Sequence, residues 1–321
     1  MAIIKTEGSY RSADKEHDLH YCVWTPEGNP RGVIQICHGM NEFIERYQAT
    51  AEYLAGLGYV ICGNDMLGHG EACPPDDRGF FGSEDGVENI VADVEGLRLI
   101  MRKRYRMLPY FLLGHSMGSF VARAYVTRYP DALDGLILCG TSGTVKSVKN
   151  GLKLLRLLIA LKGERYRSPF VYKLAYKGYN DRFATEKDPV AWLSKNVENR
   201  QAAYNDERFN FIFTLRGYQT LLLLLQEISD PQWALDYPKS LPVLVLSGKD
   251  DPVGAYGSGP HEVCDRLQDA DVAEISLRLY DNCRHELFNE PEASDILREM
   301  GEWIDGVRDG VIEYRNAGWH P

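Results

Sequence analysis

The sequence lacks an excess of basic residues, and this excludes one class of function. Of its 321 residues, 36 are Lys or Arg and 46 are Asp or Glu, so the formal net charge is -10 at pH 7. A protein that holds a nucleic-acid backbone needs a surface rich in Lys and Arg, because every phosphate is negatively charged. We therefore expect no nucleic-acid partner.

Long apolar runs are also missing. Eighteen uncharged apolar residues never follow one another, and residues 1–18 contain no apolar segment after a basic start. A membrane-spanning helix needs about 20 apolar residues, and a secretory signal needs an apolar stretch of roughly 7–15. The sequence predicts neither, so we expect a cytoplasmic protein.

The seven cysteines form no C-x-x-C pair, and three of them, at positions 37, 62 and 139, lie in or beside apolar runs. Buried free thiols are the expected outcome, rather than disulfides or metal ligands. His261 is followed by Glu262 but does not complete an H-E-x-x-H pattern, and no grouping of His, Cys and Asp has the spacing of a metal site. We expect no metal.

Short apolar runs alternate with segments whose apolar residues recur at helical spacing. The runs expected as strands are 32–37, 59–62, 110–113, 136–139, 242–246 and 275–279, and the helical patterns are 47–57, 90–105, 119–129 and 293–304. Strands buried on both faces by helices have this pattern. It predicts an α/β fold with a mostly parallel, doubly wound sheet. Residues 19–25, followed by a Pro- and Gly-containing turn at 26–30, predict an antiparallel hairpin at its edge.

The alternation stops between residues 144 and 237. Helical, aromatic-rich sequence replaces it, including 152–161 and 214–228. This predicts a core built from residues 1–143 and 238–321, with residues 144–237 inserted as a helical cap or lid over a site. Apolar cap residues such as Leu158 are expected to wall a pocket for an acyl chain. A second packing layer without a ligand role is the alternative.

Residues 114–118, Gly-His-Ser-Met-Gly, form a G-x-S-x-G motif directly after a predicted strand and before a predicted helix. In that setting the two glycines relieve crowding at a sharp turn, and Ser116 can hold its Oγ out above the sheet. The helix start then directs free N–H groups, including that of Met117, at an oxygen that becomes negative. Ser116 is the predicted nucleophile.

A serine nucleophile needs a histidine base, which in turn needs a carboxylate. His285 follows the predicted strand 275–279 and is the expected base, whereas His115 is adjacent to Ser116 and its side chain should diverge under the turn. Asp250 and Asp251 both follow the strand 242–246, and the residues alone separate them poorly. Asp251 is favoured because Pro252 restricts its backbone to extended conformations.

A second N–H donor for the oxyanion is expected from the loop after strand 32–37. Gly39 in this loop permits close approach of the backbone to a substrate. The N–H of Met40 is then the natural partner of the Met117 N–H, unless residues 38–39 merely form a turn.

At these residues the sequence resembles the monoacylglycerol lipase and lysophospholipase group of α/β-hydrolases, which is also grouped with serine aminopeptidase-like hydrolases. The resemblance spans nearly the whole chain, through the motifs at 38–42 with 46–47, 64–70, 114–118, 248–251 and 285–290. It implies the α/β-hydrolase fold. The family's G-x-x-D spacing carries over onto Asp251, and Asp65 and His69 are expected to brace loops. The family commonly has a serine two positions after residue 70, where this chain has Glu71-Ala72.

The resemblance implies a serine carboxylic-ester hydrolase that cleaves monoacyl lipid esters, of the monoacylglycerol or lysophospholipid kind, through an acyl-enzyme and without a cofactor. A short-chain carboxylesterase and a serine aminopeptidase are alternatives. The aminopeptidase would need an acidic cap residue to hold a substrate amine, and the candidates are Glu164, Asp181, Glu186 and Glu198. A ligand-sensing protein on a hydrolase scaffold is the non-enzymatic alternative.

The expected partner is a small ester or lipid. Residues 151–163 form an amphipathic segment with Lys153 and Arg156 on one face. Such a helix either covers an acyl pocket, which we favour, or makes transient contact with a membrane surface. The acyl length, the leaving group and the oligomeric state are left open by the sequence.

Overall fold

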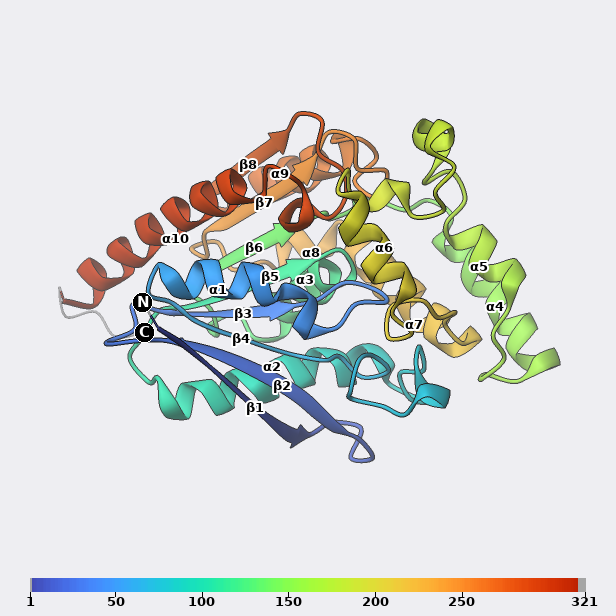
Figure 1. The fold of residues 1–321 in the computed structure, drawn as a ribbon, viewed down its shortest axis with the longest axis horizontal. Coiled ribbons are helices and arrows are strands. Elements are labelled where there is room, and N and C mark those ends of the chain that lie inside the picture. The colour runs from blue at the N-terminus through green and yellow to red at the C-terminus, as the bar shows by residue number, and fades with distance from the viewer. Residues whose placement is uncertain (1, 317–321) are drawn as a thin grey trace.

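The computed structural model describes residues 2–316, in which one eight-stranded sheet lies between two layers of helices (Figure 1). The strand order is β1-β2-β4-β3-β5-β6-β7-β8. Strand β1 is antiparallel to β2, and β2 is antiparallel to β4, whereas all the remaining neighbours are parallel. The mostly parallel sheet predicted from the sequence is confirmed.

Each expected strand is present within a few residues of its predicted range. The strands are β1 (Ile3–Arg11), β2 (Asp18–Pro26), β3 (Val33–Cys37), β4 (Val60–Asn64), β5 (Tyr110–His115), β6 (Gly135–Cys139), β7 (Val243–Gly248) and β8 (Ile275–Tyr280). The helices of the core are α1 (Gln48–Gly56), α2 (Gly86–Arg104), α3 (Met117–Arg128), α9 (Ser258–Asp269) and α10 (Ala293–Asn316).

The central strands are buried on both faces, because alternate residues point to opposite helical layers. In β7, Leu244 and Leu246 belong to the same apolar cluster as residues of α1 and α10, while Val243 and Val245 belong to the cluster that contains residues of α2, α3 and α9. An apolar residue is therefore required at every position, which explains the uninterrupted apolar runs in the sequence.

Two details differ from the expectation. Strand β8 is only half-buried, because it is the edge strand and has a neighbour on one side alone. Residues 19–25 do form an antiparallel hairpin, but the turn at 26–30 does not close it. Strand β2 pairs with β1, which precedes it, and β1 forms the sheet edge.

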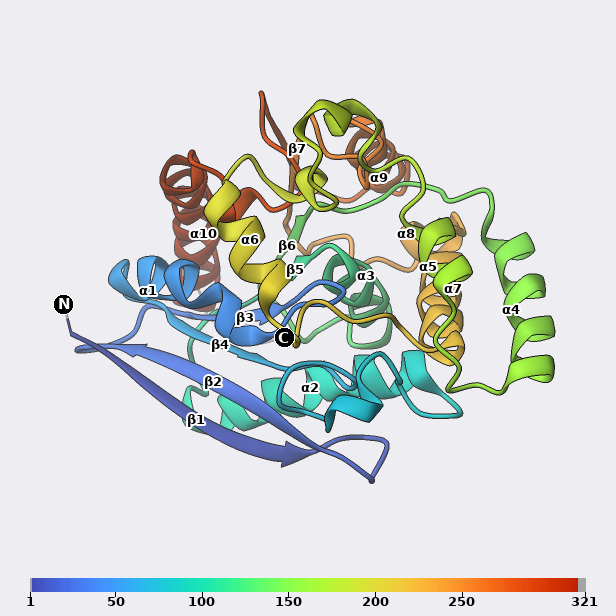
Figure 2. The same ribbon diagram turned by 45° about the vertical axis from the view of Figure 1, so that its right-hand side comes forward.

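Between β6 and β7 the described chain contains helices and no strand. These are α4 (Val148–Lys162), α5 (Pro169–Ala175), α6 (Val197–Asn205), α7 (Leu215–Ser229) and α8 (Gln232–Leu235), with 3-10 turns η3 (Asp181–Glu186) and η4 (Ala191–Leu193). Figure 2 shows α4 at the outer end of the molecule and α7 nearer the sheet. Leu215, Leu224 and Ile228 of α7 are part of the same apolar core as α3. Among the described residues, none of the helices is both long and apolar enough to cross a membrane.

Candidate active site

Ser116 lies at the turn between β5 and α3, in a backbone conformation that non-glycine residues rarely adopt. Its φ is 51° and its ψ is -120°, which is strained for an L residue. A Cβ added at Gly114 would lie 2.5 Å from the Gly118 carbonyl oxygen, and one at Gly118 would lie 2.0 Å from the Cys37 oxygen. Only glycine fits at either position, so the motif residues are required by the packing of this turn.

His285 lies after β8, and its ring contacts the carboxylate of Asp251, which follows β7. Its Nδ1 is 3.0 Å from both Asp251 carboxylate oxygens. Asp251 is fully buried, and its Oδ1 also accepts a hydrogen bond from the N–H of Val253 at 2.8 Å. Because Nδ1 is engaged by the carboxylate, Nε2 is the nitrogen left to face a substrate or a hydroxyl.

Asp250 is directed elsewhere. Its side chain is 38% exposed, and its carboxylate is 3.8 Å from the guanidinium of Arg182. The structure therefore brings Asp251, and not Asp250, to His285.

Met40 and Met117, the two predicted sources of oxyanion donors, line the same cavity as Ser116 and His285. Met117 is the first residue of α3, so its N–H has no partner within the helix. Gly39 approaches the serine closely, since a Cβ there would be 3.0 Å from the Ser116 Cβ. The loop glycine predicted from the sequence thus allows this close contact.

A buried ion network lies beneath these residues. One oxygen of Glu42, Oε2, accepts hydrogen bonds from the Gly39 N–H at 2.6 Å and the Tyr47 hydroxyl at 2.7 Å, and it lies 2.9 Å from Nδ1 of His115. Burial alone raises the pKa of Glu42, but the charges of His115 and Arg46 hold it well below its ordinary value. Burial likewise opposes the charged form of His115, yet Glu42 raises the pKa of that imidazole. His115 is thus buried and bonded within this network, as predicted.

Arg46 extends the network to the His285 loop, because its guanidinium is 3.0 Å from the buried carboxylate of Glu286. The Nε2 of His115 is also 3.3 Å from the His285 carbonyl oxygen. One charged network thus contacts the glycine loop, the serine turn and the histidine loop. Sequence reasoning did not predict that Glu42, Arg46 and Glu286 are buried together as ion pairs. In the sequence alone, charged residues at these positions are equally consistent with loops exposed to solvent.

Asp65 and His69 hold loops, as the sequence suggested. Asp65 accepts hydrogen bonds from the N–H groups of Ile44 at 2.7 Å and Glu71 at 2.9 Å. Burial lowers the pKa of His69 to about 3, so its neutral ring accepts a hydrogen bond from the N–H of Asn41 at 3.2 Å.

A cavity of about 730 Å³ opens above Ser116 and His285. Its outer walls come from the helices between β6 and β7, and include Leu154, Leu155, Val171, Tyr172, Tyr176, Trp192, Tyr218, Leu221, Leu222 and Leu225. The lining is mainly apolar, which suits an acyl chain. Leu158, which was expected in this wall, packs against the main core instead and does not line the cavity.

Two contacts between these helices and the core were missed by sequence reasoning. The Trp192 ring lies over the His285 ring, with centroids 5.1 Å apart. The Asn41 amide donates to the carbonyl oxygens of Phe209 and Phe211, at 2.9 and 2.7 Å, and its Oδ1 accepts from the Tyr176 hydroxyl at 3.3 Å. Both contacts join residues more than 90 positions apart, so no local signal reveals them.

None of the four acidic residues suggested for binding a substrate amine lines the cavity. Glu164 is 2.9 Å from the Arg216 guanidinium, and Glu186 is 2.8 Å from that of Arg200. The acids that do line the cavity, Glu42 and Glu286, are held by Arg46. This arrangement does not favour an aminopeptidase.

Known proteins that are similar to this chain agree with the fold and the site described above. Residues 28–292 match the sequence profile of the family described as "Serine aminopeptidase, S33". The chain is 31% identical over 291 residues to the monoglyceride lipase of Mus musculus, covering 88% of this chain and 84% of that protein. The chain belongs to the serine aminopeptidase S33 family of α/β-hydrolases.

Other relatives of this S33 hydrolase agree. The monoacylglycerol lipase of Mycolicibacterium smegmatis is 29% identical over 286 residues, which is 88% of this chain and 91% of that protein. The crystal structure of a highly thermostable carboxyl esterase from Bacillus coagulans in complex with glycerol superimposes with a TM-score of 0.88 at 29% identity, covering 96% of this chain and 99% of that one. The predicted fold and the family resemblance are confirmed, and the chain is a hydrolase of the lipase and esterase class.

Proposed function

We propose that this S33 hydrolase cleaves carboxylic esters of monoacyl lipids, with Ser116, His285 and Asp251 as its catalytic triad. The observation that carries the proposal is the cavity itself. Ser116 and His285 form its floor, and leucine and aromatic side chains form the walls above them. The names of its relatives, which include monoacylglycerol lipases, support the same substrate class.

In the proposed reaction Ser116 Oγ attacks the acyl carbonyl carbon while Nε2 of His285 accepts the hydroxyl proton. The N–H groups of Met40 and Met117 stabilise the resulting oxyanion. His285 then gives its proton to the leaving alcohol as the ester bond breaks. Water, deprotonated by His285, attacks the acyl-enzyme, and the fatty acid leaves as Ser116 is regenerated. Asp251 keeps His285 in the required tautomer throughout, and no cofactor takes part.

The direct test is a panel of p-nitrophenyl esters of graded chain length, together with monoacylglycerols, lysophospholipids and aminoacyl anilides. Each methylene buried in the cavity contributes up to about 0.8 kcal/mol, so kcat/KM should rise by up to about fourfold per carbon until the cavity is full. Ser116→Ala should lower kcat by roughly 10⁴ to 10⁶ without changing the fold. Fast turnover of aminoacyl anilides with indifference to acyl length would support the aminopeptidase instead.

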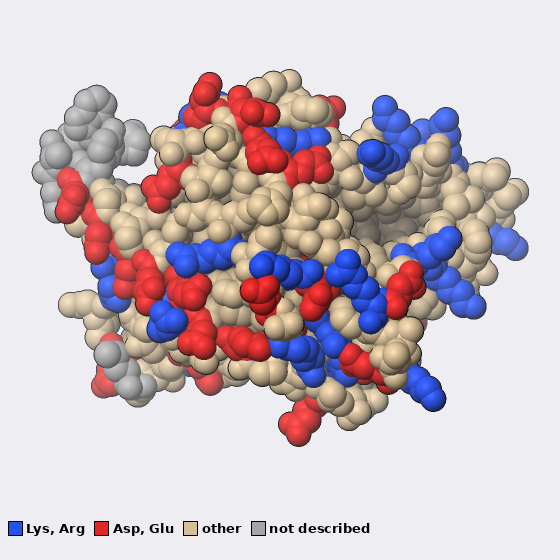
Figure 3. Space-filling model, turned by 90° about the horizontal axis from the view of Figure 1, so that it is seen from above, with Lys and Arg blue, Asp and Glu red and all other residues tan. Residues whose placement is uncertain are grey.

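We further propose that residues 144–237 form a cap over the cavity. We also propose that this cap contacts membrane surfaces. Residues 144–177 contain nine Lys or Arg and a single acidic residue, although the whole chain carries a net charge of -10. Large apolar side chains of α4 and α5 are exposed in the same region, including Leu157, Leu161 and Phe170. Figure 3 shows Lys and Arg around a hollowed, uncharged surface at this end of the molecule. Exposed apolar residues among cations suit an anionic lipid surface.

Co-sedimentation with phosphatidylcholine vesicles, with and without phosphatidylserine, tests this contact. The parent should bind the anionic vesicles more strongly, and Leu161→Glu should weaken that binding. Leu99→Glu, on exposed α2 surface, is the matched control and should have no effect. If both variants lose the same amount of vesicle binding, the cap does not form the contact with the membrane.

A further inference from the structure

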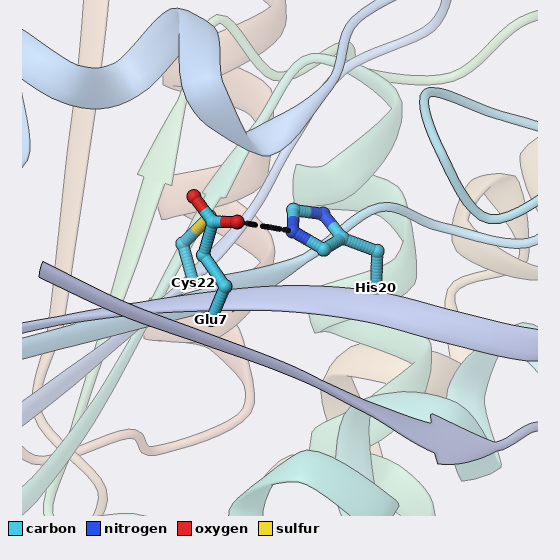
Figure 4. A group of neighbouring side chains, drawn as sticks. All are labelled: Glu7, His20 and Cys22. Carbon is cyan, nitrogen blue, oxygen red and sulfur yellow. Dashed lines mark hydrogen bonds and ion pairs between the residues drawn. The ribbon is translucent and has the colours of Figure 1, made fainter.

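Three side chains with metal-binding atoms converge on one face of the N-terminal hairpin, away from the active site (Figure 4). In the register of β1 and β2, Glu7 lies directly opposite Cys22. His20 is two residues before Cys22, so both side chains leave the same face of β2. Within residues 2–316, this is the single group of three or more His, Cys, Asp or Glu side chains whose ligand atoms are close enough to share an ion.

The distances fit a small tetrahedral ion. The three ligand atoms lie within 4.8 Å of one another. His20 Nε2 is 3.7 Å from Glu7 Oε2 and 3.9 Å from Cys22 Sγ. With metal–ligand bonds of about 2.0–2.3 Å, tetrahedral coordination places ligand atoms about 3.3–3.8 Å apart. The two distances from His20 Nε2 are close to this range, and the Glu7–Cys22 distance, which is at most 4.8 Å, would have to close by up to about 1 Å to bring all three onto one ion.

The other nitrogen of His20 is already held as metal-binding histidines require. Nδ1 is 3.2 Å from Oδ2 of Asp65. That carboxylate is itself buried and fixed by the N–H groups of Ile44 and Glu71. A carboxylate behind the imidazole fixes its tautomer, directs Nε2 outward and makes it a better ligand.

The nearby ammonium group of Lys5 does not block the space between Glu7, His20 and Cys22. Lys5 Nζ is 2.8 Å from Glu7 Oε1, and it is shared with Glu45 at 3.1 Å. Glu7 Oε2 therefore stays on the side of His20 and Cys22. The Glu7 side chain is 52% exposed whereas Cys22 is fully buried, so an ion would enter from the side of Glu7 and keep a water as its fourth ligand.

From this arrangement we propose that Glu7, His20 and Cys22 bind a divalent ion of the zinc class. A thiolate, an imidazole and a carboxylate are the donors that zinc takes in proteins, whereas magnesium and calcium prefer oxygen alone. The ion clamps β1 to β2 and, through Asp65, to the start of the 3-10 turn η1 (Ile44–Tyr47). Its role is structural and does not depend on the proposed function. The site departs from the metal-free expectation because strand pairing, not sequence spacing, supplies Glu7.

The test uses the full-length protein, freed of metal by chelation. Zn²⁺ is titrated in competition with a chromophoric chelator, and Co²⁺ is followed by its thiolate charge-transfer absorption. The parent should bind one equivalent and show the Co²⁺–thiolate band. Glu7→Gln and His20→Gln should each weaken zinc binding by at least about tenfold, and Cys22→Ser should abolish the band. Cys264→Ser, a partly buried thiol on α9, should change neither.

Thermal unfolding distinguishes a metal-binding site from a simple network of ion pairs. Zn²⁺ should raise the Tm of the parent and leave the Tm of His20→Gln unchanged. If zinc raises both equally, or binds Glu7→Gln as tightly as the parent, the proposal is wrong. It is also overturned if zinc has no effect on the parent while Glu7→Gln lowers Tm without metal. Because Glu7 and His20 are partly exposed, their variants carry the test even if Cys22→Ser does not fold.

Discussion

Two adjacent aspartates differ completely in their environment. Asp251 is fully buried and contacts His285, whereas Asp250 is partly exposed and faces Arg182. Asp251→Asn should lower kcat for ester hydrolysis by about 10⁴, because the amide no longer holds His285 in the required tautomer. Steady-state kinetics on a p-nitrophenyl ester measure the change.

Asp250→Asn is the matched control at the neighbouring position. Asp250 follows the same strand as Asp251, but its carboxylate pairs with Arg182 at the surface. Because such an exposed ion pair contributes little, this variant should retain kcat within about twofold. A larger loss at 250 than at 251 would overturn the assignment of the acid.

Glu42 is the residue on which the buried network depends. It accepts from Gly39, Tyr47 and His115 at one oxygen and pairs with Arg46 at the other. Glu42→Gln should lower the free energy of unfolding by about 3 kcal/mol, because buried Arg46 loses one of its two carboxylate partners and His115 loses the carboxylate beside its Nδ1. Urea denaturation measures the loss.

Glu45→Gln provides the comparison, three residues further on. Glu45 pairs with Lys5 and Arg208 at the surface, so its loss should cost less than about 1 kcal/mol. Similar losses in both variants would mean that burial of the network contributes no more than a surface ion pair.

At the scale of elements, α4 presents one face to the cavity and another to solvent. Leu154 lines the cavity, whereas Leu157 on the same helix is 57% exposed. Leu154→Trp should fill part of the cavity and shift the preferred acyl chain to shorter esters, with turnover of acetyl esters retained. Chain-length profiles of kcat/KM measure the shift.

Leu157→Trp adds the same volume outside the cavity and should keep the parent's profile. If the two variants behave alike, the wall formed by α4 does not limit acyl length. If Leu154→Trp abolishes acetyl-ester turnover as well, the substitution has disturbed the serine turn rather than the acyl site.

For the whole molecule, a buried carboxylate links stability to pH. Asp93 of α2 accepts hydrogen bonds from the Ser12 hydroxyl at 2.9 Å and the Ala13 N–H at 2.7 Å, which ties the hairpin turn to the core. Burial raises the pKa of Asp93 to about 7. Between pH 4 and 7 the folded state therefore holds a proton that the unfolded chain has released. The free energy of unfolding should fall as pH rises through this window, by at most about 1.4 kcal/mol per unit.

Asp93→Asn removes this titration and should flatten the dependence over the same window. Asp295→Asn, whose carboxylate is 75% exposed, should leave the slope unchanged. The comparison needs chemical denaturation at several pH values between 4.5 and 7. If the free energy of unfolding of Asp93→Asn depends on pH as steeply as that of the parent, a group other than Asp93 takes up the proton.

The sequence by itself determined the alternation of strands and helices, the sharp turn at Ser116 and the loops that carry Met40, Asp251 and His285. These features follow from short-range rules. Apolar periodicity over a few residues selects the element, and the glycines at 114 and 118 are required by contacts at the turn itself. Strand order along the chain then places the loop residues at the same edge of a parallel sheet.

Only the tertiary structure decided which distant residues meet. Strand β2 pairs with β1 rather than across the turn at 26–30, and this register places Glu7 beside Cys22. Trp192 lies over His285, and Asn41 bonds to Phe211. Such contacts depend on the free energy of packing whole elements together, to which residues far apart in the chain contribute jointly. No local pattern of apolar or charged residues contains that information, because the partner of each of these side chains comes from a part of the chain that lies outside its own local sequence.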